Sequence, residues 1–412
     1  MTYYDGGICN LVTSTRVWTV TDGLPDSKIT SNVSDDGCQF WTTTSASTRC
    51  RVLTSEQGIT FMRTREGNEI NPSVVTIKPT LVEVDGQQNF PVDSVTQAYR
   101  VENSFVGIDQ WWFATDGGGI LACEAATSLG FPALQNCTAY NTTNSPWIPT
   151  DAVTTLTVKE VASRDVTGAT IIDDWAAVVG GRTYDNKPAG VGLWHVNYVQ
   201  GVDYMEQSSL PDVSGVGYSI PISSEVAIGL DGFGYPELQV LVGLQFDPRT
   251  GYQPLSIFQK ATDDVTAFMQ MRGETIPTPW TNTDNLWVPY GDVSTIEHDV
   301  NSGSNATYRI ALDASRSTAF SNLPGALIDF RIIPGQQTFD PRTSRIDSFS
   351  SAVVDYTDVE FFTAQGNDYL VASYKDREGG GGIRVFTSSV NGWFQLCENP
   401  EAGDSVSARI AD

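Results

Sequence analysis

The segment from Gln110 to Leu121 constrains the fold of this chain more than any other. It reads Gln-Trp-Trp-Phe-Ala-Thr-Asp-Gly-Gly-Gly-Ile-Leu, so an aromatic stretch thins into small residues, turns on glycines and continues as a second apolar stretch. Asp and Gly readily adopt the positive φ angles that tight hairpin turns require. The segment therefore predicts two antiparallel strands joined by a short turn.

An earlier stretch follows the same pattern, since Trp18-Thr-Val-Thr-Asp-Gly-Leu-Pro25 leads to Cys38-Gln-Phe-Trp-Thr-Thr-Thr44. Both stretches resemble the repeats of the two-component-regulator type of β-propeller, in which a T-x-x-D-G-L-P turn precedes a strand ending in W-x-x-T-x-x-G-G. The resemblance extends from about Arg16 to Cys123. It implies propeller blades, and it implies ligand sensing as one role, because such repeats are commonly found in the periplasmic part of hybrid sensor kinases.

Strand and turn signals recur along the rest of the chain, and small residues within the strands fit positions between neighbouring blades near a narrow axis. Further apolar segments run from Trp175 to Gly181, Leu238 to Leu244, Leu286 to Tyr290 and Tyr369 to Tyr374. Turn clusters rich in Asp, Asn, Pro and Gly begin at Asp116, Asp185, Asp247 and Glu378. We therefore predict an all-β chain of repeated antiparallel meanders with almost no helix.

The spacing of these segments predicts the number of blades. The positions taken as comparable are separated by 71, 63, 66, 46 and 83 residues, and they are Trp41, Trp112, Trp175, Leu241, Trp287 and Leu370. This spacing predicts six four-stranded blades in a single closed propeller over residues 1–412, with the ring closed by the N- and C-terminal segments. Seven blades remain an alternative, because the last interval has room for another blade around Ala326 to Ile333.

Charge excludes two classes of partner. The chain carries 24 Lys and Arg against 49 Asp and Glu, a net charge of −25. Such a surface repels phosphate backbones and anionic lipids, so we expect neither nucleic-acid binding nor membrane insertion. Met1-Thr-Tyr-Tyr-Asp lacks the basic and apolar regions of a secretory signal, so either the chain is soluble where it is made or a leader precedes this numbering.

Six cysteines lie at positions that a propeller would bring together in pairs. A hairpin centred near Thr44 would place Cys38 opposite Cys50, Cys123 and Cys137 bracket one loop, and a closed ring would bring Cys9 close to Cys397. We predict these three bridges and an oxidising compartment. The alternative is six buried thiols in a reducing cell.

Catalytic motifs are absent from the sequence, which has no G-x-G-x-x-G loop and no G-x-S-x-G elbow. Of the only two histidines, we expect His195 to be a packed strand residue and His298 a solvated loop residue. The remaining enzymatic hypothesis is a central carboxylate pair of the kind used in glycoside hydrolysis. The candidate pairs are Asp35-Asp36, Asp173-Asp174 and Asp263-Asp264, for which we favour a turn-capping role.

Two further kinds of site have only weak support. Asp116 and Asp231 have the oxygen ligands of a calcium site, but no D-x-D-x-D-G loop is present; we therefore predict no cofactor, with calcium as the one alternative. Sequences of the Asn-x-Ser/Thr form, which accept glycans only on a eukaryotic secretory route, begin at Asn32, Asn136, Asn141 and Asn305.

The leading functional hypothesis is a non-catalytic propeller that acts as a structural or adhesive module at the surface of a virion, a tail or another extracellular assembly. Its partners would be other subunits or a cell-surface ligand. We expect Trp147 and Trp280, which lie in proline-rich connections, to anchor such a partner. The alternative is that each tryptophan packs over the edge of its own blade as a core residue. The alternatives are an extracytoplasmic ligand-sensing propeller and a carbohydrate-active enzyme.

Overall fold

A computed structural model of the chain describes most of the strand-forming parts of the sequence. The described residues are 2–5, 8–11, 29–35, 37–42, 45, 47–65, 68–88, 90–92, 94–103, 108–164, 170–185, 188–199, 202–209, 220–230, 236–245, 255–261, 272–275, 292–298, 307–313, 325–331, 344–346, 354–364, 366–376, 381–389 and 392–401. Within these ranges the helical structure is limited to one 3-10 turn, η1 (Pro79–Leu81). The all-β prediction is therefore confirmed.

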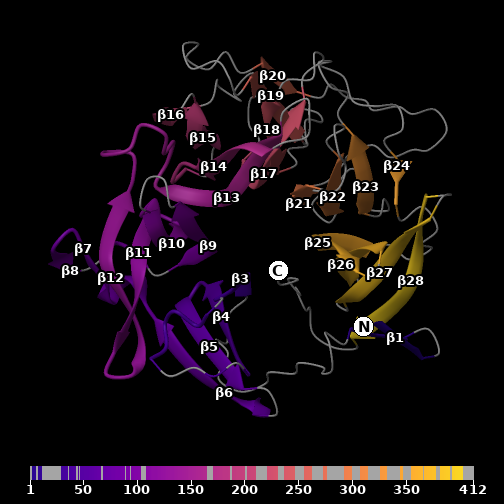
Figure 1. The fold of residues 1–412 in the computed structure, drawn as a ribbon, viewed down its shortest axis with the longest axis horizontal. Coiled ribbons are helices and arrows are strands. Elements are labelled where there is room, and N and C mark those ends of the chain that lie inside the picture. The colour runs from indigo at the N-terminus through magenta and orange to yellow at the C-terminus, as the bar shows by residue number, and fades with distance from the viewer. Residues whose placement is uncertain are drawn as a thin grey trace.

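The described strands form six sheets arranged around a common axis (Figure 1). Each sheet has four antiparallel strands that follow one another in the chain, so each sheet is one blade of a β-propeller. Blade 1 consists of β3 (Ile29–Ser34), β4 (Thr48–Ser55), β5 (Gly58–Arg65) and β6 (Asn68–Ile77). Blade 2 consists of β9 (Val95–Asn103), β10 (Ile108–Thr115), β11 (Ile120–Ser128) and β12 (Phe131–Tyr140). Blade 3 consists of β13 (Ala152–Arg164), β14 (Thr170–Arg182), β15 (Pro188–Val199) and β16 (Val202–Ser209). Blade 4 consists of β17 (Pro221–Leu230), β18 (Pro236–Leu244), β19 (Leu255–Ala261) and β20 (Arg272–Thr275). Blade 5 consists of β21 (Asp292–His298), β22 (Thr307–Asp313), β23 (Ala326–Arg331) and β24 (Ser344–Arg345). Blade 6 consists of β25 (Val354–Ala364), β26 (Asn367–Asp376), β27 (Gly381–Ser389) and β28 (Gly392–Glu401).

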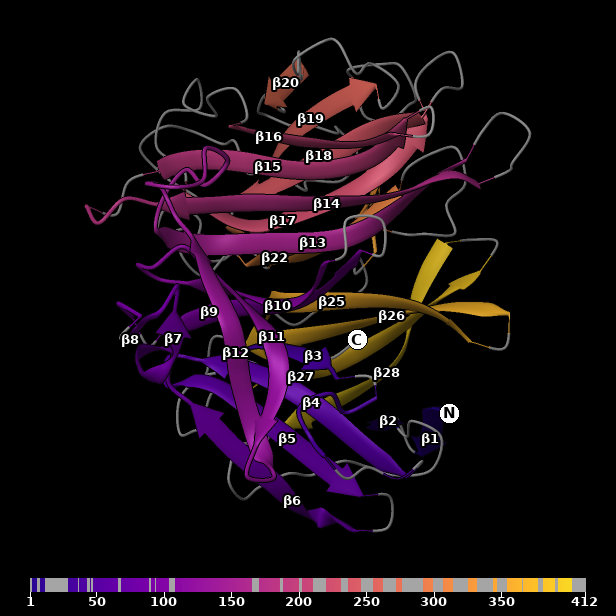
Figure 2. The ribbon, with the colours of Figure 1, turned by 60° about the vertical axis from the view of Figure 1, so that its left-hand side comes forward.

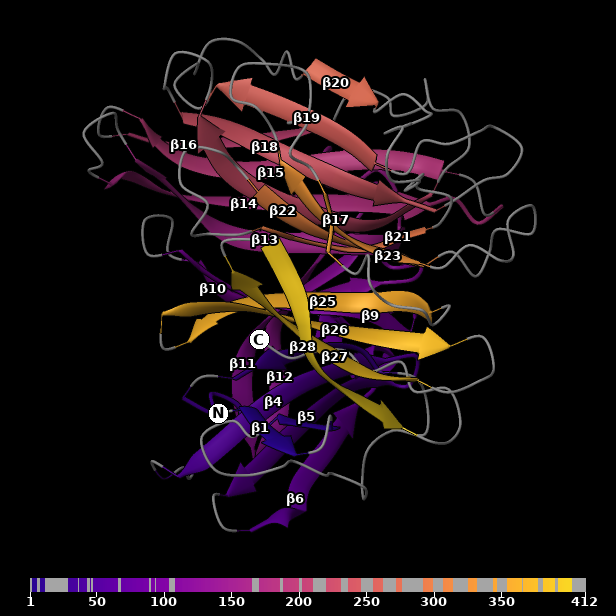
Figure 3. The same ribbon diagram turned by 90° about the vertical axis from the view of Figure 1, so that its right-hand side faces the viewer.

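Four short strands extend two of the blades at their outer edges. β7 (Glu83–Val84) and β8 (Gln87–Gln88) extend blade 2 beyond β12. β1 (Thr2–Asp5) and β2 (Ile8–Leu11) extend blade 6, where β2 pairs in parallel with β28 through Ile8 and Glu398 (Figure 3). The N-terminal and C-terminal strands of the described chain therefore lie side by side in one sheet.

The blade repeat is more regular than the sequence suggested. The second strands of the blades begin at Thr48, Ile108, Thr170, Pro236, Thr307 and Asn367. Successive starts are thus 60 to 71 residues apart. Ala326 begins β23, the third strand of blade 5, so it does not mark a seventh blade. Trp41, which was expected on a strand, lies in the connection between β3 and β4, and Trp287 lies outside the described residues.

Each blade is sandwiched between its two neighbours, as β10 illustrates. Trp111 packs toward blade 1, with its ring centroid 5.3 Å from that of Phe40. The next residue, Trp112, points to the other face and packs toward blade 3, 5.2 Å from the ring of Trp194. Because side chains alternate along a strand, two adjacent tryptophans contribute to the apolar cores on both sides of blade 2.

Small residues in the strands are required where neighbouring segments approach closely. A Cβ atom added at Gly192 would lie 1.5 Å from the carbonyl oxygen of Trp147. In the turn after β10, Gly119 has a φ of +77°, and a Cβ there would lie 2.1 Å from the Tyr140 carbonyl oxygen. The turn predicted at Asp116 joins β10 to β11, and the turn predicted at Asp185 joins β14 to β15.

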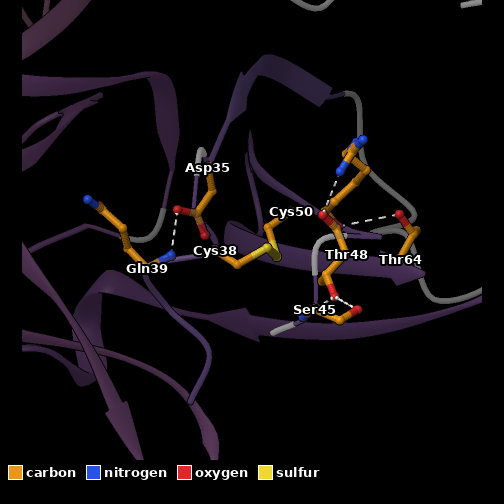
Figure 4. The surroundings of a disulfide bond; sticks show 8 residues. Asp35, Cys38, Gln39, Ser45, Thr48, Cys50 and Thr64 are labelled. Carbon is orange, nitrogen blue, oxygen red and sulfur yellow. Dashed lines mark hydrogen bonds between the residues drawn. A yellow bond between two sulfur atoms is a disulfide. The ribbon is translucent and has the colours of Figure 1, made fainter. Parts of the chain in front are cut away.

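Two of the three predicted disulfides are present. Cys38, in the connection after β3, is bonded to Cys50 on β4 (Figure 4). The N–H of Asp35 donates to the Cys50 carbonyl at the base of this connection, and Thr44 lies outside the described residues. Cys123 and Cys137 join β11 to β12. The third pair stays a prediction, although the β2–β28 pairing makes neighbours of the strands that carry Cys9 and Cys397.

Candidate functional site on the inner strands

The innermost strand of every blade contains a β-bulge close to its start. The ladder with the second strand skips one residue in each case, and the skipped residues are Thr30, Thr96, Thr154, Ile222, Ser294 and Thr357. A bulge leaves one residue unpaired and re-aims its side chain. Five of the six skipped residues carry a hydroxyl, and Ile222 is followed by Ser223.

Five hydroxyls connect blades 1 to 5 to the blade that follows. They belong to four of the skipped residues and to Ser223, and each donates a hydrogen bond to the carbonyl oxygen of the residue that precedes the bulge in the following blade. The pairs are Thr30 to Val95 at 2.7 Å, Thr96 to Val153 at 3.3 Å, Thr154 to Pro221, Ser223 to Val293 at 2.6 Å, and Ser294 to Tyr356 at 2.8 Å. We call this set the hydroxyl series. The Thr357 hydroxyl of blade 6 lies 2.8 Å from the Ser373 hydroxyl of the same blade.

A buried ion pair crosses from blade 3 to blade 4 on the same strands. The Nζ of Lys159 on β13 lies 2.7 Å from Oε2 of Glu225 on β17. Glu225 is almost fully buried, whereas about a third of the Lys159 side chain is exposed. Glu225 also accepts a hydrogen bond from its neighbour Val226, 2.7 Å from Oε1, and one from the backbone of His298. This carboxylate therefore contacts three successive blades.

Blade 5 adds further charged and polar groups to this region. Tyr308 packs against His298 with ring centroids 5.2 Å apart and donates its hydroxyl to Oε1 of Gln239 in blade 4 at 2.8 Å. Arg309 forms a buried ion pair with Asp329, with Nη1 2.5 Å from Oδ1. Its guanidinium also lies 5.1 Å from the ring centroid of Trp393 in blade 6. We call Lys159, Glu225, Glu297, His298, Arg309 and Asp329 the axial charged cluster.

Burial and neighbouring charges determine the ionisation of this cluster. Burial raises the pKa of the Glu225 carboxyl above its ordinary value, against the opposing attraction of Lys159. Burial opposes the charge on Lys159, but the carboxylates of Glu225 and Glu297 outweigh it, so its pKa lies above the ordinary range. Burial, together with the positive charges of Lys159 and Arg309, lowers the pKa of His298 to about 4. His298 is therefore neutral at physiological pH.

The arrangement uses charge to join blades. The Glu225 carboxylate is held in place by bonds to an ammonium group and to two backbone positions. Of the partners of Glu225, Lys159 lies in blade 3, His298 lies in blade 5 and Val226 is the next residue on β17. The Lys159–Glu225 pair and the hydroxyls of Thr154, Ser223 and Ser294 thus lie along β13, β17 and β21.

The residues proposed from sequence as acid pairs are placed differently from this cluster. Asp35 is buried and accepts the Gln39 N–H at 2.9 Å, which is the turn-capping role that was expected. Asp173 and Asp174 lie on β14, the second strand of blade 3. Asp36 and the pair Asp263-Asp264 lie outside the described residues.

Both histidines lie on strands. His195 is on β15, paired with Ala176 and Glu206, as expected for a strand residue. His298 was expected in a solvated loop, and this was wrong. It ends β21, and its ladder partner Tyr308 packs against its ring. The polar neighbours Glu297 and Asp299 suggested a loop in sequence, but Glu297 and His298 lie on a strand whose polar groups contact neighbouring blades.

Trp147 is a core residue and not an exposed anchor, so this prediction was also wrong. Only 1% of its surface is exposed, and its ring lies 5.9 Å from Trp112 and 6.4 Å from Tyr140. The proline-rich connection folds inward over the core between blades 2 and 3. Trp280 lies outside the described residues. For the calcium hypothesis, Asp116 instead pairs with Arg182 at 2.7 Å, and Asp231 lies outside the described part of the chain.

Sequence reasoning missed the hydroxyl series and the axial charged cluster. The series has a detectable signal, because the skipped residues Thr30, Thr96, Thr154 and Ser294 each follow an Ile or Val and recur at about the length of one or two blades. The Lys159–Glu225 pair has no local signal, since 66 residues separate its members. The described residues contain no group of three or more His, Cys, Asp or Glu side chains suited to a metal ion. No described helix has the length and hydropathy needed to cross a membrane.

Comparison with known proteins gives no family. No protein-family model matches the chain, and no curated protein matches its sequence. Several solved structures are similar over most of its length. A mutant of AofleA from Arthrobotrys oligospora is 12% identical, with a TM-score of 0.38 over 93% of this chain and 91% of that one.

Two other similar structures are of different kinds. The GH93 alpha-L-arabinofuranosidase of Fusarium graminearum, in complex with arabinobiose, is 10% identical, with a TM-score of 0.41 over 90% of this chain and 92% of that one. The WD40 domain of SCAP from fission yeast is 8% identical, with a TM-score of 0.35 over 92% and 75%. Scores this low transfer neither ligand nor activity, so the assignment of this chain as a six-bladed β-propeller rests on its own six sheets.

Proposed function

We propose that this chain is a non-catalytic β-propeller that serves as a structural or adhesive module in an extracellular assembly, such as a virion or a tail. The observation that carries the proposal is the engagement of Glu225. This buried inner-strand carboxylate is bound by Lys159 of one neighbouring blade and by the backbone of His298 of the other. The carboxylate of Glu225, on an innermost strand, thus holds blades 3, 4 and 5 together.

Compartment and charge support display outside the cell. Two disulfides indicate an oxidising environment, because such bonds persist in secreted, periplasmic and surface proteins. A net charge of −25 keeps copies apart in solution and favours a partner surface of opposite charge. Both properties suit a module that is held in an assembly by specific contacts.

We further propose that the repeats are related to those of the two-component-regulator propellers. The support is the β10–β11 hairpin, where Trp112-Phe-Ala-Thr-Asp-Gly-Gly-Gly forms the strand and turn of one blade. The preceding stretch around Asp22 lies outside the described residues. This relationship would make ligand sensing the second candidate function.

Native mass spectrometry and particle imaging of the source material test the proposal. We expect the chain in stoichiometric amounts within a symmetric assembly. A parallel screen for sugar release would use the wild-type chain and the Glu225→Gln variant, and we expect no turnover from either. A monomer that releases sugar, with the release lost in Glu225→Gln, would establish an enzyme instead. Specific retention of a small solute by a monomer would establish the sensor.

A further inference from the structure

Two of the four Asn-x-Ser/Thr sequences begin on the outer strand of blade 2 and directly after it. Asn136 is exposed on β12, and its Nδ2 makes a surface hydrogen bond to Glu124 at 2.7 Å. Its φ of +49° lifts the residue out of the regular strand beside the bulge at Cys123. Thr138 supplies the hydroxyl two positions later, as an acceptor sequence for N-linked glycans requires.

The second sequence begins directly after β12. Asn141 is half-buried in the connection to blade 3, and its Oδ1 accepts both the N–H and the hydroxyl of Thr143. These bonds use the oxygen of the carboxamide, whereas glycan attachment uses the nitrogen. Thr142 and Thr143 are exposed, so the surroundings of this connection are open to solvent.

The other two sequences differ in their position. Asn32 lies on β3, the innermost strand of blade 1, where it is paired with Leu53 of β4 and where β3 also contacts β9 of the next blade. An oligosaccharide on this strand would have to fit beside two packed neighbours. Asn305 lies outside the described residues.

The edge that carries Asn136 is otherwise poorly covered. Beyond β11, the described partner of β12 is β7, which pairs with it only at Cys137. Leu81, Leu129 and Phe131, three of the four exposed large hydrophobic residues of the described chain, belong to η1 and the β11–β12 hairpin of this blade. Figure 2 shows this hairpin running beside the strands of blade 1. An open strand edge with exposed apolar side chains favours association with other chains unless something covers it.

We propose that Asn136 and Asn141 are acceptors for N-linked glycans, and that the glycan at Asn136 covers the open apolar edge of blade 2. The oxidising compartment indicated by the two disulfides is also where such transfer takes place. The donor is a lipid-linked oligosaccharide pyrophosphate. Nδ2 of the asparagine forms a bond with the anomeric carbon, the bond from that carbon to the phosphate oxygen breaks, the lipid pyrophosphate leaves, and the amide proton passes to the transferase. This inference does not depend on whether the propeller is catalytic.

The test is secretion of the full chain from eukaryotic cells, followed by intact mass before and after peptide N-glycosidase treatment. We expect two glycans at Asn136 and Asn141. Asn136→Gln and Thr138→Ala should each remove one glycan, Thr138→Ser should retain it, and Asn32→Gln should change nothing. Unmodified Asn136 and Asn141 in the secreted protein, or a glycan at Asn32, would overturn the assignment.

The covering role has its own readout. Light scattering of the deglycosylated chain should show self-association at concentrations where the glycosylated chain has a constant mass. Adding Leu129→Gln and Phe131→Gln, which create no new acceptor sequence, should suppress this association. An unchanged mass after deglycosylation would overturn the covering role.

Discussion

The contact between blades 1 and 2 and the contacts among blades 3, 4 and 5 are made by different kinds of side chain. Between blades 1 and 2 the contact is aromatic, with Phe40 of blade 1 5.3 Å from Trp111 of blade 2, and these blades carry both described disulfides. Among blades 3 to 5 the contact includes charged groups, because Glu225 of blade 4 binds Lys159 of blade 3 and the backbone of His298 of blade 5. The propeller backbone therefore accommodates either chemistry, and the two regions should respond to different perturbations.

The aromatic region should show the largest response to a single truncation. Trp111→Ala should lower the free energy of unfolding by about 3 to 5 kcal/mol, because Trp111 is fully buried between two blades and the cavity would not collapse completely. Tyr184→Ala, at a residue that is 81% exposed, is the matched control and should cost about 0.5 kcal/mol or less. Denaturant unfolding of both variants measures the difference. Equal effects would show that the core between blades 1 and 2 is not packed as described.

Removing a disulfide should cost somewhat less and should affect only the first region. The double replacement Cys38→Ala with Cys50→Ala should lower the free energy of unfolding by about 3 kcal/mol, since the bridge closes a loop with a sequence separation of 12. The same double replacement should leave the pH dependence of stability unchanged. A shifted pH dependence would show that the two regions are coupled.

Acid should act on the charged region through His298. Its pKa is about 4 in the folded chain and about 6.5 when unfolded, so the unfolded state binds the proton first as the pH falls. Stability from this residue is thus present above about pH 6.5 and is lost between about pH 6.5 and 4, by up to about 3 kcal/mol. Glu225, whose pKa is raised, contributes with the opposite sign. Unfolding of wild type and His298→Gln across this range isolates the histidine, and parallel curves would contradict its buried, neutral state.

The smallest effect is expected in the hydroxyl series, which both regions share. Thr154→Val should cost about 1 kcal/mol, because the Pro221 carbonyl oxygen of blade 4 loses the hydrogen bond donated by blade 3. Thr142→Val, at an exposed threonine, is the control and should be nearly neutral. If thermal unfolding separates neither variant from wild type, these bonds contribute nothing measurable to stability.

Local patterns predicted the fold well and the site poorly. The hairpin at Gln110 to Leu121 and the pairs Cys38–Cys50 and Cys123–Cys137 could be predicted because each depends on residues close in the chain. Trp41 was expected on a strand but lies in a connection. Trp147 was assigned wrongly because an aromatic residue in a connection looks the same in sequence whether it packs inward or outward. The Lys159–Glu225 pair was not predicted, since only the closed arrangement of blades brings these side chains together.

The central claim is that inner-strand carboxylates join blades, and a double-mutant cycle at Lys159 and Glu225 tests it most directly. Lys159→Met alone should cost about 3 to 5 kcal/mol, because it leaves Glu225 buried without its cation. Adding Glu225→Leu should recover much of this loss, which gives a coupling free energy of about 2 kcal/mol or more from denaturant unfolding. If the free-energy costs of the two single substitutions add up to the cost of the double variant to within about 0.5 kcal/mol, the account is contradicted.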